Sequence, residues 1–321
     1  MLDIEAEVRE AGKRISNLVR RTPVEESRWL GRTAGCSVSL KLENLQISSS
    51  FKLRGAANKL LSLGEDERRK GVVAASTGNH GAAVAHLLTR FGWPGVIYLP
   101  ETASPSKIRA LEEQEVELVL VGSDGIDAER IARTEAERSG RIFLSPYNDV
   151  KVIGGQGTIG LELEDQIERI DTVLIPVGGG GLAAGVGGYL KAIDDSIEII
   201  GCQPLASRVM YESIQAGEVL ELESSPTLAD GTAGGVEADS VTLPLCQEVI
   251  DDFLLVDEGE ILAAIRHMLT RHHLLIEGAA ALPIAALLQS ARRFAGKSVV
   301  LILTGARLSM NALARVVSAE G

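Results

Sequence analysis

Residues 172–182 read TVLIPVGGGGL, a short apolar run followed by four consecutive glycines and the start of an apolar helical pattern. The apolar run predicts a buried strand, and the pattern from Leu182 onward predicts a helix. Glycines lose much conformational entropy when they are ordered, so four of them at a strand-to-helix junction indicate a close approach of the backbone to a ligand. Successive backbone N–H groups at such a junction bind phosphate. We therefore expect Gly178, Gly179, Gly180 and Gly181 to form a phosphate-binding loop.

Strands and helices are expected to alternate along the rest of the chain. This order is the signature of parallel βαβ units and predicts an α/β fold. The expected strands are residues 38–42, 72–75, 95–99, 116–121, 141–144, 172–177, 197–202, 252–256 and 298–303. The expected helices are residues 51–63, 81–91, 104–114, a charged segment ending at 139, 157–169, 207–216, 258–271, 279–289 and 309–319, with an irregular stretch over 226–236.

The composition favours an α/β protein that binds a small molecule. The chain has 321 residues, of which 45% are hydrophobic, 3% are aromatic and 34 are glycines, a balance typical of parallel sheets covered by helices of small residues. Its formal charge of −12 is not offset by a basic patch, so nucleic acid and anionic membrane surfaces are poor partners.

The three cysteines indicate a reducing compartment. Cys36, Cys202 and Cys246 are far apart and odd in number, and no metal-ligand spacing surrounds them. The acidic N-terminus lacks the pattern of an export signal, and no apolar run approaches the roughly 18 residues of a membrane span. We expect a soluble cytoplasmic protein, with the mixed-charge runs 65–70 and 128–141 as solvated helix faces.

Residues 48–56, SSSFKLRGA, place Lys52 just inside a helix start. The serines are good N-caps. The positive end of the helix dipole and the guanidinium of Arg54 both disfavour an ammonium here, so the pKa of Lys52 should fall and its free amine could act as a nucleophile. An ordinary lysine that reaches solvent from the first helical turn is the alternative on this segment alone.

Two further strand ends carry polar residues, and ligands of open parallel sheets bind at such ends. Residues 76–81, STGNHG, suit a carboxylate because glycines turn amides inward and polar side chains add donors. Thr304, in the sequence TGAR at 304–307, could hold an uncharged ring nitrogen or could cap the last helix.

Other kinds of site are less well supported. Gly178, Gly180 and Ala183 satisfy the loose dinucleotide pattern, which keeps a nicotinamide dehydrogenase as an alternative, but Gln203 stands where that fold needs an acid. His267, His272 and His273 have the wrong helical spacing for a shared metal ion. A GxSxG hydrolase elbow is absent from the sequence.

The segments SFKLRGA at 50–56, STGNHG at 76–81, GGGGL at 178–182 and TGAR at 304–307 together resemble the serine/threonine dehydratase family. LADG at 228–231 and IEGA at 276–279 look like two further family stretches. This family belongs to the fold type II pyridoxal-phosphate enzymes, which include serine racemase. The resemblance implies two open twisted parallel-sheet lobes of the tryptophan synthase beta type. Residues 1–70 and 149–321 would form a large cofactor-binding domain, and residues 71–148 a small mobile domain.

The resemblance also implies roles for individual residues. Lys52 would form the Schiff base with pyridoxal phosphate and then remove the Cα proton of the substrate. The other residues implied for the cofactor are Phe51 beside the ring, Asn79 at the 3-hydroxyl, Gly178, Gly179, Gly180, Gly181 and Leu182 at the phosphate, Glu277 near the ring and Thr304 at the pyridine nitrogen. The substrate carboxylate would be framed by Ser76, Thr77, Asn79 and His80, with Ser76 and Thr77 also in catalytic positions.

The implied reaction is the elimination of water from L-threonine or L-serine to give a 2-oxo acid and ammonia. Departures from the family pattern bear on the details. Thr77 stands where racemases carry a serine, which argues against racemisation, and Gln203 stands where a cation-binding glutamate would be, so we expect no such metal site. Arg307 could read a group of the substrate. The chain stops soon after the last strand, so feedback by isoleucine is not expected.

Alternatives remain within and outside this chemistry. A dehydratase of threo-3-hydroxyaspartate or of a hydroxyectoine-derived compound, and a serine racemase, share the fold. A catalytically silent ligand-binding protein is the alternative if Lys52 is merely structural. By analogy with the family, we expect a homodimer or a higher homo-oligomer.

Overall fold

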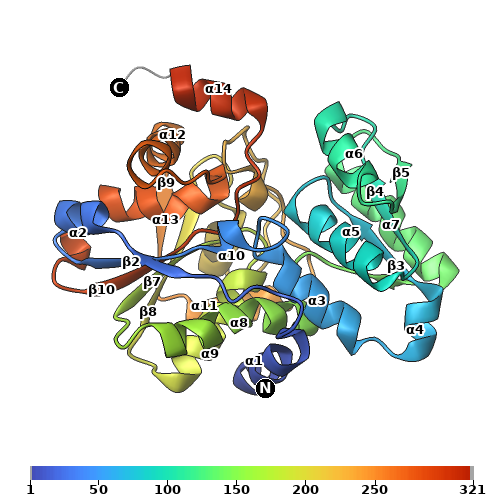
Figure 1. Cartoon of the computed structure of the whole chain (residues 1–321), viewed down its shortest axis with the longest axis horizontal. Coiled ribbons are helices and arrows are strands. Elements are labelled where there is room, and N and C mark those ends of the chain that lie inside the picture. Colours follow the sequence, from blue (N-terminus) through green and yellow to red (C-terminus); the bar gives the residue numbers. More distant parts are fainter. Residues whose placement is uncertain (1, 319–321) are drawn as a thin grey trace.

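The computed structural model describes residues 2–318 and contains two separate sheets (Figure 1). The larger sheet has the strand order β1-β2-β10-β7-β8-β9, and all neighbours are parallel except β1 and β2. The strands are β1 (Val24–Glu26), β2 (Ser37–Lys41), β7 (Thr172–Pro176), β8 (Glu198–Pro204), β9 (Asp252–Val256) and β10 (Ser298–Ile302). The central strand β7 is buried throughout, as a parallel strand covered on both faces must be.

The smaller sheet lies to the right in Figure 1 and has the parallel order β5-β4-β3-β6. Its strands are β3 (Val72–Ala75), β4 (Gly95–Leu99), β5 (Glu117–Leu120) and β6 (Ile142–Phe143), and its helices are α5 (Asn79–Phe91), α6 (Pro105–Glu112) and α7 (Gly125–Ser139). We call this part, residues 72–143, the small lobe. The predicted α/β class with two parallel sheets is confirmed.

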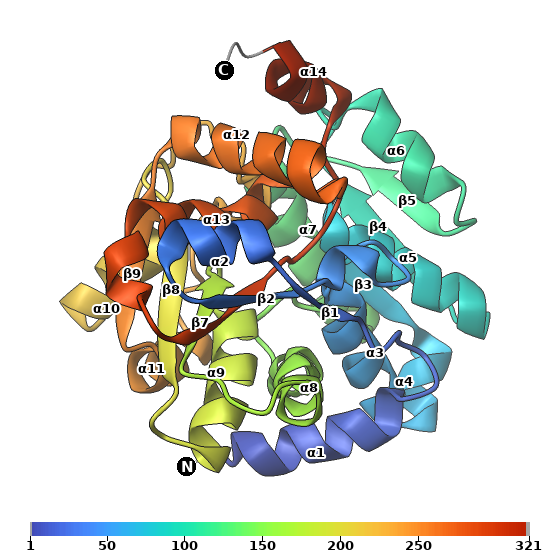
Figure 2. The same cartoon turned by 60° about the vertical axis from the view of Figure 1, so that its left-hand side comes forward.

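Helices cover both faces of the larger sheet, with α1, α8 and α9 on one side and α2, α12 and α13 on the other (Figure 2). These and the remaining helices are α1 (Ile4–Ile15), α2 (Arg28–Ala34), α3 (Lys52–Ser62), α4 (Glu65–Lys70), α8 (Val150–Gln166), α9 (Gly181–Ile193), α10 (Val209–Ala216), α11 (Thr242–Val249), α12 (Glu258–His267), α13 (Gly278–Gln289) and α14 (Met310–Ser318). The charged helix α4 has no buried residue, as expected for a solvated face.

The helix predicted from residue 157 begins seven residues earlier, at Val150 of α8. Asp149 caps it, because its side chain accepts the N–H of Lys151 at 2.7 Å. The glycines that weaken the helical pattern are needed for packing. A Cβ on Gly155 would lie 2.6 Å from the carbonyl oxygen of Arg54, and one on Gly157 would lie 2.8 Å from that of Gly185. The backbones of α3, α8 and α9 are therefore in direct contact.

Other boundaries differ in smaller ways. The predicted helix 258–271 is α-helical only to His267 and continues as a π-helical turn from Met268 to His272. The predicted last helix is observed as α14, and its expected final residue, Ala319, lies outside the described residues. The serines before Lys52 do not cap α3, because the N-cap position is Phe51, without a side-chain hydrogen bond. The sequence did not predict α1, α2, α11 or the edge strand β1.

A buried cluster of four charged side chains connects α3 to the larger sheet and to α8. Arg54 is fully buried and donates two hydrogen bonds to Glu43, from Nε at 2.8 Å and from Nη2 at 2.8 Å. It binds Glu162 of α8 through Nη1 at 2.7 Å and Nη2 at 3.0 Å. Lys41, at the end of β2, is also fully buried and donates to Glu162 and to the carbonyl oxygen of Thr22. The cluster fixes the first turn of α3.

The charges of the cluster compensate one another. Burial disfavours the ionised form of Glu43, but the neighbouring guanidinium outweighs it and lowers the pKa of Glu43. Burial also opposes the charge of Arg54, and its two carboxylate partners nevertheless raise its pKa. Each charge has hydrogen-bond partners in place of water, which is the condition under which buried ion pairs are tolerated.

Replacing Arg54 by methionine should destabilise the protein strongly, because Glu43 would stay buried without its cation and Glu162 would keep only Lys41. Removal of one partner of a buried ion pair costs about 3–5 kcal/mol, and we expect a loss of that order in the free energy of unfolding from urea titration. Adding Glu43→Gln to Arg54→Met should recover part of the loss. Arg9→Met, at an exposed ion pair with Glu5, is the control and should leave the midpoint nearly unchanged. Equal midpoints for Arg54→Met and the control would contradict this assignment.

Candidate active site

Four segments meet at the carboxyl edges of the two sheets. Lys52 is the first residue of α3, Asn79 is the first residue of α5, the loop 178–180 joins β7 to α9, and Thr304 follows β10. Glu277, the N-cap of α13, links two of these segments, because its carboxylate accepts two hydrogen bonds from Nδ2 of Asn79 at 2.9 Å each and one from Oγ1 of Thr304 at 3.4 Å. The contact with Asn79 joins the small lobe to the larger sheet.

Glu277 is held in an enclosed, polar environment. Its side chain is buried, and burial raises its pKa to about 7, although the bond from Asn79 opposes this shift. The backbone N–H of Arg307 also donates to its Oε2 at 3.2 Å. A Cβ on Gly305 would lie only 2.5 Å from its Oε1, so any other residue there would displace the carboxylate of Glu277. The TGAR segment is thus folded around the carboxylate of Glu277.

Lys52 has an unusual electrostatic environment. Burial lowers its pKa to about 8, and the negative charge of Glu277 partly opposes the shift. Its Nζ donates to the carbonyl oxygen of Pro146 at 2.9 Å and lies 5.1 Å from the ring centroid of Phe51. The predicted direction of the shift is confirmed, but the predicted contribution of Arg54 is wrong. The guanidinium of Arg54 is compensated by its carboxylate partners, and burial is the cause.

The glycine loop is closely packed on its outer side. Gly180 has φ +86°, in the left-handed region that favours glycine, and a Cβ on Gly179 would lie 2.5 Å from the ring of Tyr147. Oγ1 of Thr242 donates to the carbonyl oxygen of Gly179 at 2.6 Å, and the thiol of Cys246 to that of Gly180 at 3.5 Å. The carbonyl groups therefore have partners within the protein. The N–H groups at the start of α9 have none within their helix and can accept an anion.

The segment 144–148 closes the site. The sequence predicted only that a strand ends there. Its Leu144 carbonyl oxygen accepts Nε2–H of His80 at 2.8 Å, its Pro146 carbonyl oxygen accepts Lys52, and its Tyr147 packs against the glycine loop. A signal for it was present in the sequence, because Ser145 and other polar residues follow a predicted strand of the small sheet at its carboxyl end.

The STGNHG loop is a tight turn at the start of α5. The backbone N–H of Gly78 donates to Oγ of Ser76 at 3.2 Å, and a Cβ on Gly81 would lie 2.1 Å from the carbonyl oxygen of Ser76. His80 is buried, and burial together with the charge of Lys52 lowers its pKa to about 3. His80 is therefore neutral, and its Nε2 is engaged by Leu144. Thr77 lies between these residues and is partly exposed.

These residues fit pyridoxal phosphate. Oδ1 of Asn79 is buried without a hydrogen-bond partner in the described part of the chain, although Nδ2 of the same amide is fully engaged. A buried acceptor rarely stays unpaired, so a hydroxyl donor is expected there. The glycine loop suits a phosphate, the amine of Lys52 suits an aldehyde, and Oγ1 of Thr304 suits a ring nitrogen. The four groups of the cofactor thus each have a counterpart.

Other candidate sites have ordinary structural explanations. Oε1 of Gln203 accepts the N–H of Tyr211 at 2.8 Å, and Nε2 of His272 pairs with Oγ of Ser27 at 2.9 Å. The ring of His267 lies 4.7 Å from that of Trp29. Residues 2–318 contain no group of three or more side chains arranged to hold a metal ion, and none of their helices is long and apolar enough to cross a membrane.

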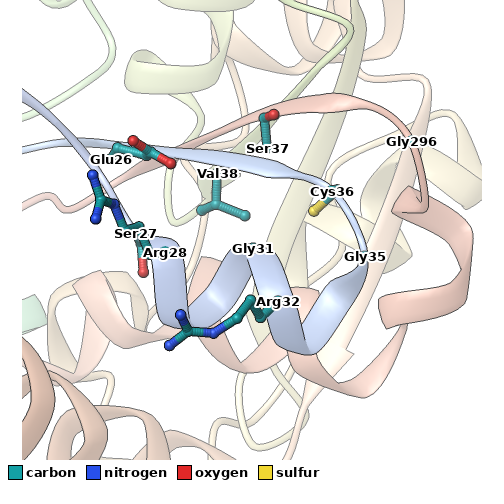
Figure 3. Close-up of a pocket in the computed structure, with 10 residues that line it drawn as sticks. All are labelled: Glu26, Ser27, Arg28, Gly31, Arg32, Gly35, Cys36, Ser37, Val38 and Gly296. Carbon is teal, nitrogen blue, oxygen red and sulfur yellow. The ribbon is translucent and has the colours of Figure 1, made fainter.

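A surface recess of about 510 Å³ lies away from this site (Figure 3). It is lined by residues of β1, α2, the start of β2 and the turn between α2 and β2, among them Arg28, Arg32 and Cys36, and by Gly296, which lies beside Gly35. These residues precede or begin strands β2 and β10, whereas Lys41 and Thr304 are at the other ends. Because ligands of open α/β sheets bind at the carboxyl ends of strands, the recess is not part of the candidate active site.

Comparisons with known proteins agree with this geometry. The chain is 37% identical to an L-threonine ammonia-lyase of Thermotoga maritima over 97% of this chain and 77% of that protein. Its structure superposes on a processed threonine deaminase isoform from Solanum lycopersicum with a TM-score of 0.93 and 32% identity, covering 98% of this chain and 86% of the other. Maize serine racemase gives a TM-score of 0.90 at 31% identity, with 98% and 96% covered.

Residues 15–305 match the family described as "Pyridoxal-phosphate dependent enzyme". The cofactor is therefore pyridoxal phosphate, and the nicotinamide interpretation of the glycine loop is wrong. The chain belongs to the pyridoxal-phosphate dependent enzyme family.

Proposed function

We propose that the protein is an L-threonine/L-serine ammonia-lyase that eliminates water from a 3-hydroxy amino acid to give a 2-oxo acid and ammonia. The observation that carries this proposal is the buried amine of Lys52, whose pKa is lowered to about 8, at the same sheet edge as the glycine loop and the Asn79–Glu277–Thr304 group. Proteins similar over most of the chain are named for threonine deamination, which supports the same reaction.

The cofactor would be held by the residues that the sequence predicted. The proposed set is Phe51, Lys52, Asn79, Gly178, Gly179, Gly180, Gly181, Leu182, Glu277 and Thr304. When bound, pyridoxal phosphate supplies an electron sink that stabilises the negative charge left at Cα when a proton is removed. The protein contributes position, charge and exclusion of water.

Lys52 would transfer the proton at Cα. Because burial lowers its pKa to about 8, a far larger fraction of the amine is neutral near physiological pH than for an ordinary lysine, and the neutral form can accept a proton. The carbonyl oxygen of Pro146 gives Nζ a fixed hydrogen-bond acceptor and so a defined direction. These two features suit a base that must return to the same position after each turnover.

Thr304 and Glu277 would set the charge at the ring. An alcohol does not protonate a pyridine nitrogen as a carboxylic acid can, so Oγ1 of Thr304 would leave that nitrogen neutral, which favours elimination. Glu277 would lie near the ring and is bound by Asn79 and the N–H of Arg307, which keep its carboxylate in place. The single hydroxyl proton of Thr304, which is directed toward Glu277 at 3.4 Å, would turn to the ring nitrogen.

The substrate carboxylate would bind at the start of α5, a helix of 13 residues whose first N–H groups favour an anion. Ser76, Thr77 and Asn79 would contribute donors there. His80 is neutral and bonded to Leu144, so its contribution would be to hold the loop rather than to supply charge. Thr77 in place of a smaller serine argues against a serine racemase.

We propose further that residues 1–70 and 149–321 form the cofactor domain and that residues 71–148 form a mobile domain that closes over the substrate. The separation into two sheets supports this division. A cytoplasmic location and a homodimeric or higher assembly stay part of the proposal, and the free state of Cys36, Cys202 and Cys246 suits a reducing compartment.

A second candidate is a dehydratase of an acidic substrate such as threo-3-hydroxyaspartate, and a hydroxyectoine-derived substrate is a related alternative. The observation that favours an acidic substrate is the position of Arg307, whose backbone N–H donates to Glu277. Its side chain has no hydrogen bond or ion pair within residues 2–318, yet burial lowers its pKa. An arginine in this position could bind a second carboxylate of the substrate.

Lys52→Ala should abolish 2-oxo acid formation from L-threonine and L-serine, because the group that moves the Cα proton is lost. General acid–base catalysis alone contributes about 10²–10⁴-fold, so activity should fall by at least this factor. Borohydride should fix a pyridoxyl group on Lys52 of the yellow wild-type protein. Lys59→Gln, two turns along the same helix, is the matched control and should stay active. Oxo acid formation by Lys52→Ala at the wild-type rate would make the lysine structural.

The rate at which cofactor-free protein captures pyridoxal phosphate should rise with pH up to about 8 and then level off, because only the neutral amine is a nucleophile. An ordinary lysine, with a pKa of about 10.4, would give a rate that still rises above pH 9. Glu277→Gln removes the charge that raises the pKa of Lys52, so the plateau should be reached at a lower pH. Glu258→Gln should not shift it. Stopped-flow absorbance measures the capture, and a plateau above pH 10 would contradict the lowered pKa.

Arg307→Gln should distinguish the two candidate substrates. If the enzyme acts on threonine and serine, this change should leave their kcat/KM nearly unchanged, because neither has a second carboxylate. If threo-3-hydroxyaspartate is the substrate, its KM should rise by about tenfold or more, the loss expected for one charged hydrogen bond. Oxo acid formation from each amino acid measures both cases, with Arg315→Gln in α14 as the control.

A further inference from the structure

One carboxylate of the irregular segment between α10 and α11 contacts the small lobe. Glu237 forms an ion pair with Arg133 of α7, with 2.8 Å between Oε1 and Nη2, and its Oε2 accepts from Nδ2 of Asn148 at 2.8 Å. Its backbone N–H donates to the hydroxyl of Tyr147 at 2.9 Å. Oγ of Ser145 lies 3.4 Å from Oε1. One residue of the large-sheet side therefore binds both the small lobe and the segment that closes the cofactor site.

Glu237 binds the segment 145–148, which also forms the outer wall of the cofactor site. The carbonyl oxygen of Pro146 accepts the amine of Lys52, the ring of Tyr147 packs against Gly179, and the Cα, Cβ and carbonyl oxygen of Tyr147 lie close to Gly181. A shift of this segment would therefore move the acceptor of Lys52 and loosen the outer wall of the glycine loop together. Neither contact involves the substrate.

We infer that Glu237 is a positioning residue, which holds the segment 145–148 so that Pro146 orients Lys52 and Tyr147 supports the phosphate loop. The inference rests on the proposed cofactor site but not on the identity of the substrate. Glu237 touches neither Lys52 nor the glycine loop in the contacts described, so its effect passes through the segment.

The surroundings of Arg133 make this contact a specific one. Arg133 also binds Glu129, one helical turn earlier in α7, at 2.8 Å, and its guanidinium lies 4.1 Å from the ring centroid of Phe143. Arg133 is thus already ordered when it meets Glu237, so little side-chain entropy is lost. A second ion pair between the lobes, Lys107 with Asp230 at 3.6 Å, is more exposed and should contribute little.

Glutamine at position 237 cannot replace both interactions. Oδ1 of Asn148 accepts the N–H of Val241 at 2.9 Å, so the Asn148 amide is held with its NH₂ group toward Glu237. A glutamine amide has one oxygen, and if that oxygen faces Arg133 then its own NH₂ group meets that of Asn148. Glu237→Gln is therefore an almost isosteric change that breaks one of the two bonds.

The test compares Glu237→Gln with Glu129→Gln, which makes the same chemical change at the other carboxylate partner of Arg133. The affinity of each cofactor-free protein for pyridoxal phosphate is measured by absorbance titration without any amino acid. We expect Glu237→Gln to weaken binding about tenfold, the effect of one charged hydrogen bond, and Glu129→Gln to change it less than about twofold. Equal affinities for the two variants would overturn the inference.

Hydrogen exchange in the cofactor-free proteins provides a second measurement. Glu237→Gln should speed exchange at residues 145–148 and 178–182 while α13 keeps its wild-type rates. Uniformly faster exchange would show general destabilisation and would contradict a positioning role. Asn148→Ala should reproduce the affinity loss, and the double variant should lose less than the product of the two single effects, because both changes act through one contact. Multiplicative effects would contradict the inference.

Activity then separates this inference from the proposed reaction. At saturating cofactor, Glu237→Gln should lower kcat more than it raises KM for the amino acid, because Lys52 is less well oriented while the substrate site is unchanged. If no tested amino acid is converted, the affinity and exchange results still decide the role of Glu237, and the proposed substrate alone is refuted.

Discussion

The buried pairing of Arg54 with two carboxylates is the constraint on which the active site depends. Arg54 lies two residues after Lys52 in the same helical turn, and its bonds to Glu43 and Glu162 fix that turn against β2 and α8. Together with Lys41, the cluster contains two positive and two negative charges, so it adds no net charge near Lys52. The main effect of such a buried network is to fix its side chains in one arrangement, and its contribution to stability is secondary. Here that arrangement is the position of the reactive amine.

The architecture could be predicted from the sequence wherever the signal is local. Short apolar runs followed by polar or glycine-rich ends located β3, β7 and β10, and with them the three strand-end loops of the site. The start of α8 could not be predicted in this way. Its glycines weaken the helical pattern, and their purpose, contact with the backbones of α3 and α9, becomes visible only in three dimensions. The partners of Arg54 lie 11 and 108 residues away, so the sequence did not reveal them and suggested that the guanidinium charge acts on Lys52.

The closing segment 144–148 escaped prediction for a different reason. Its contributions come from the carbonyl oxygens of Leu144 and Pro146, which any residue type could supply. Its aromatic residue, Tyr147, acts by filling the space that Gly179 leaves open, a relation between two distant positions. Sequence patterns identify side-chain chemistry at a strand end. They do not identify a backbone atom that orients a catalytic group, and for that reason Glu237, which binds this segment, also carried no recognisable motif.

The electrostatics of the site follow from burial rather than from opposed charges. The side chains that contact the glycine loop, Tyr147, Thr242 and Cys246, carry no positive charge. An anion there would be stabilised by the N–H groups and dipole of α9, in a chain whose formal charge is −12. Lys52 is therefore not needed as the partner of that anion. Its pKa of about 8 leaves part of the amine neutral and able to react. Glu277, whose own pKa burial raises to about 7, limits how far the pKa of the lysine falls. A phosphate site lined by positive side chains would have lowered the pKa of Lys52 further. Those side chains and a protonated Lys52 would also have competed for the phosphate.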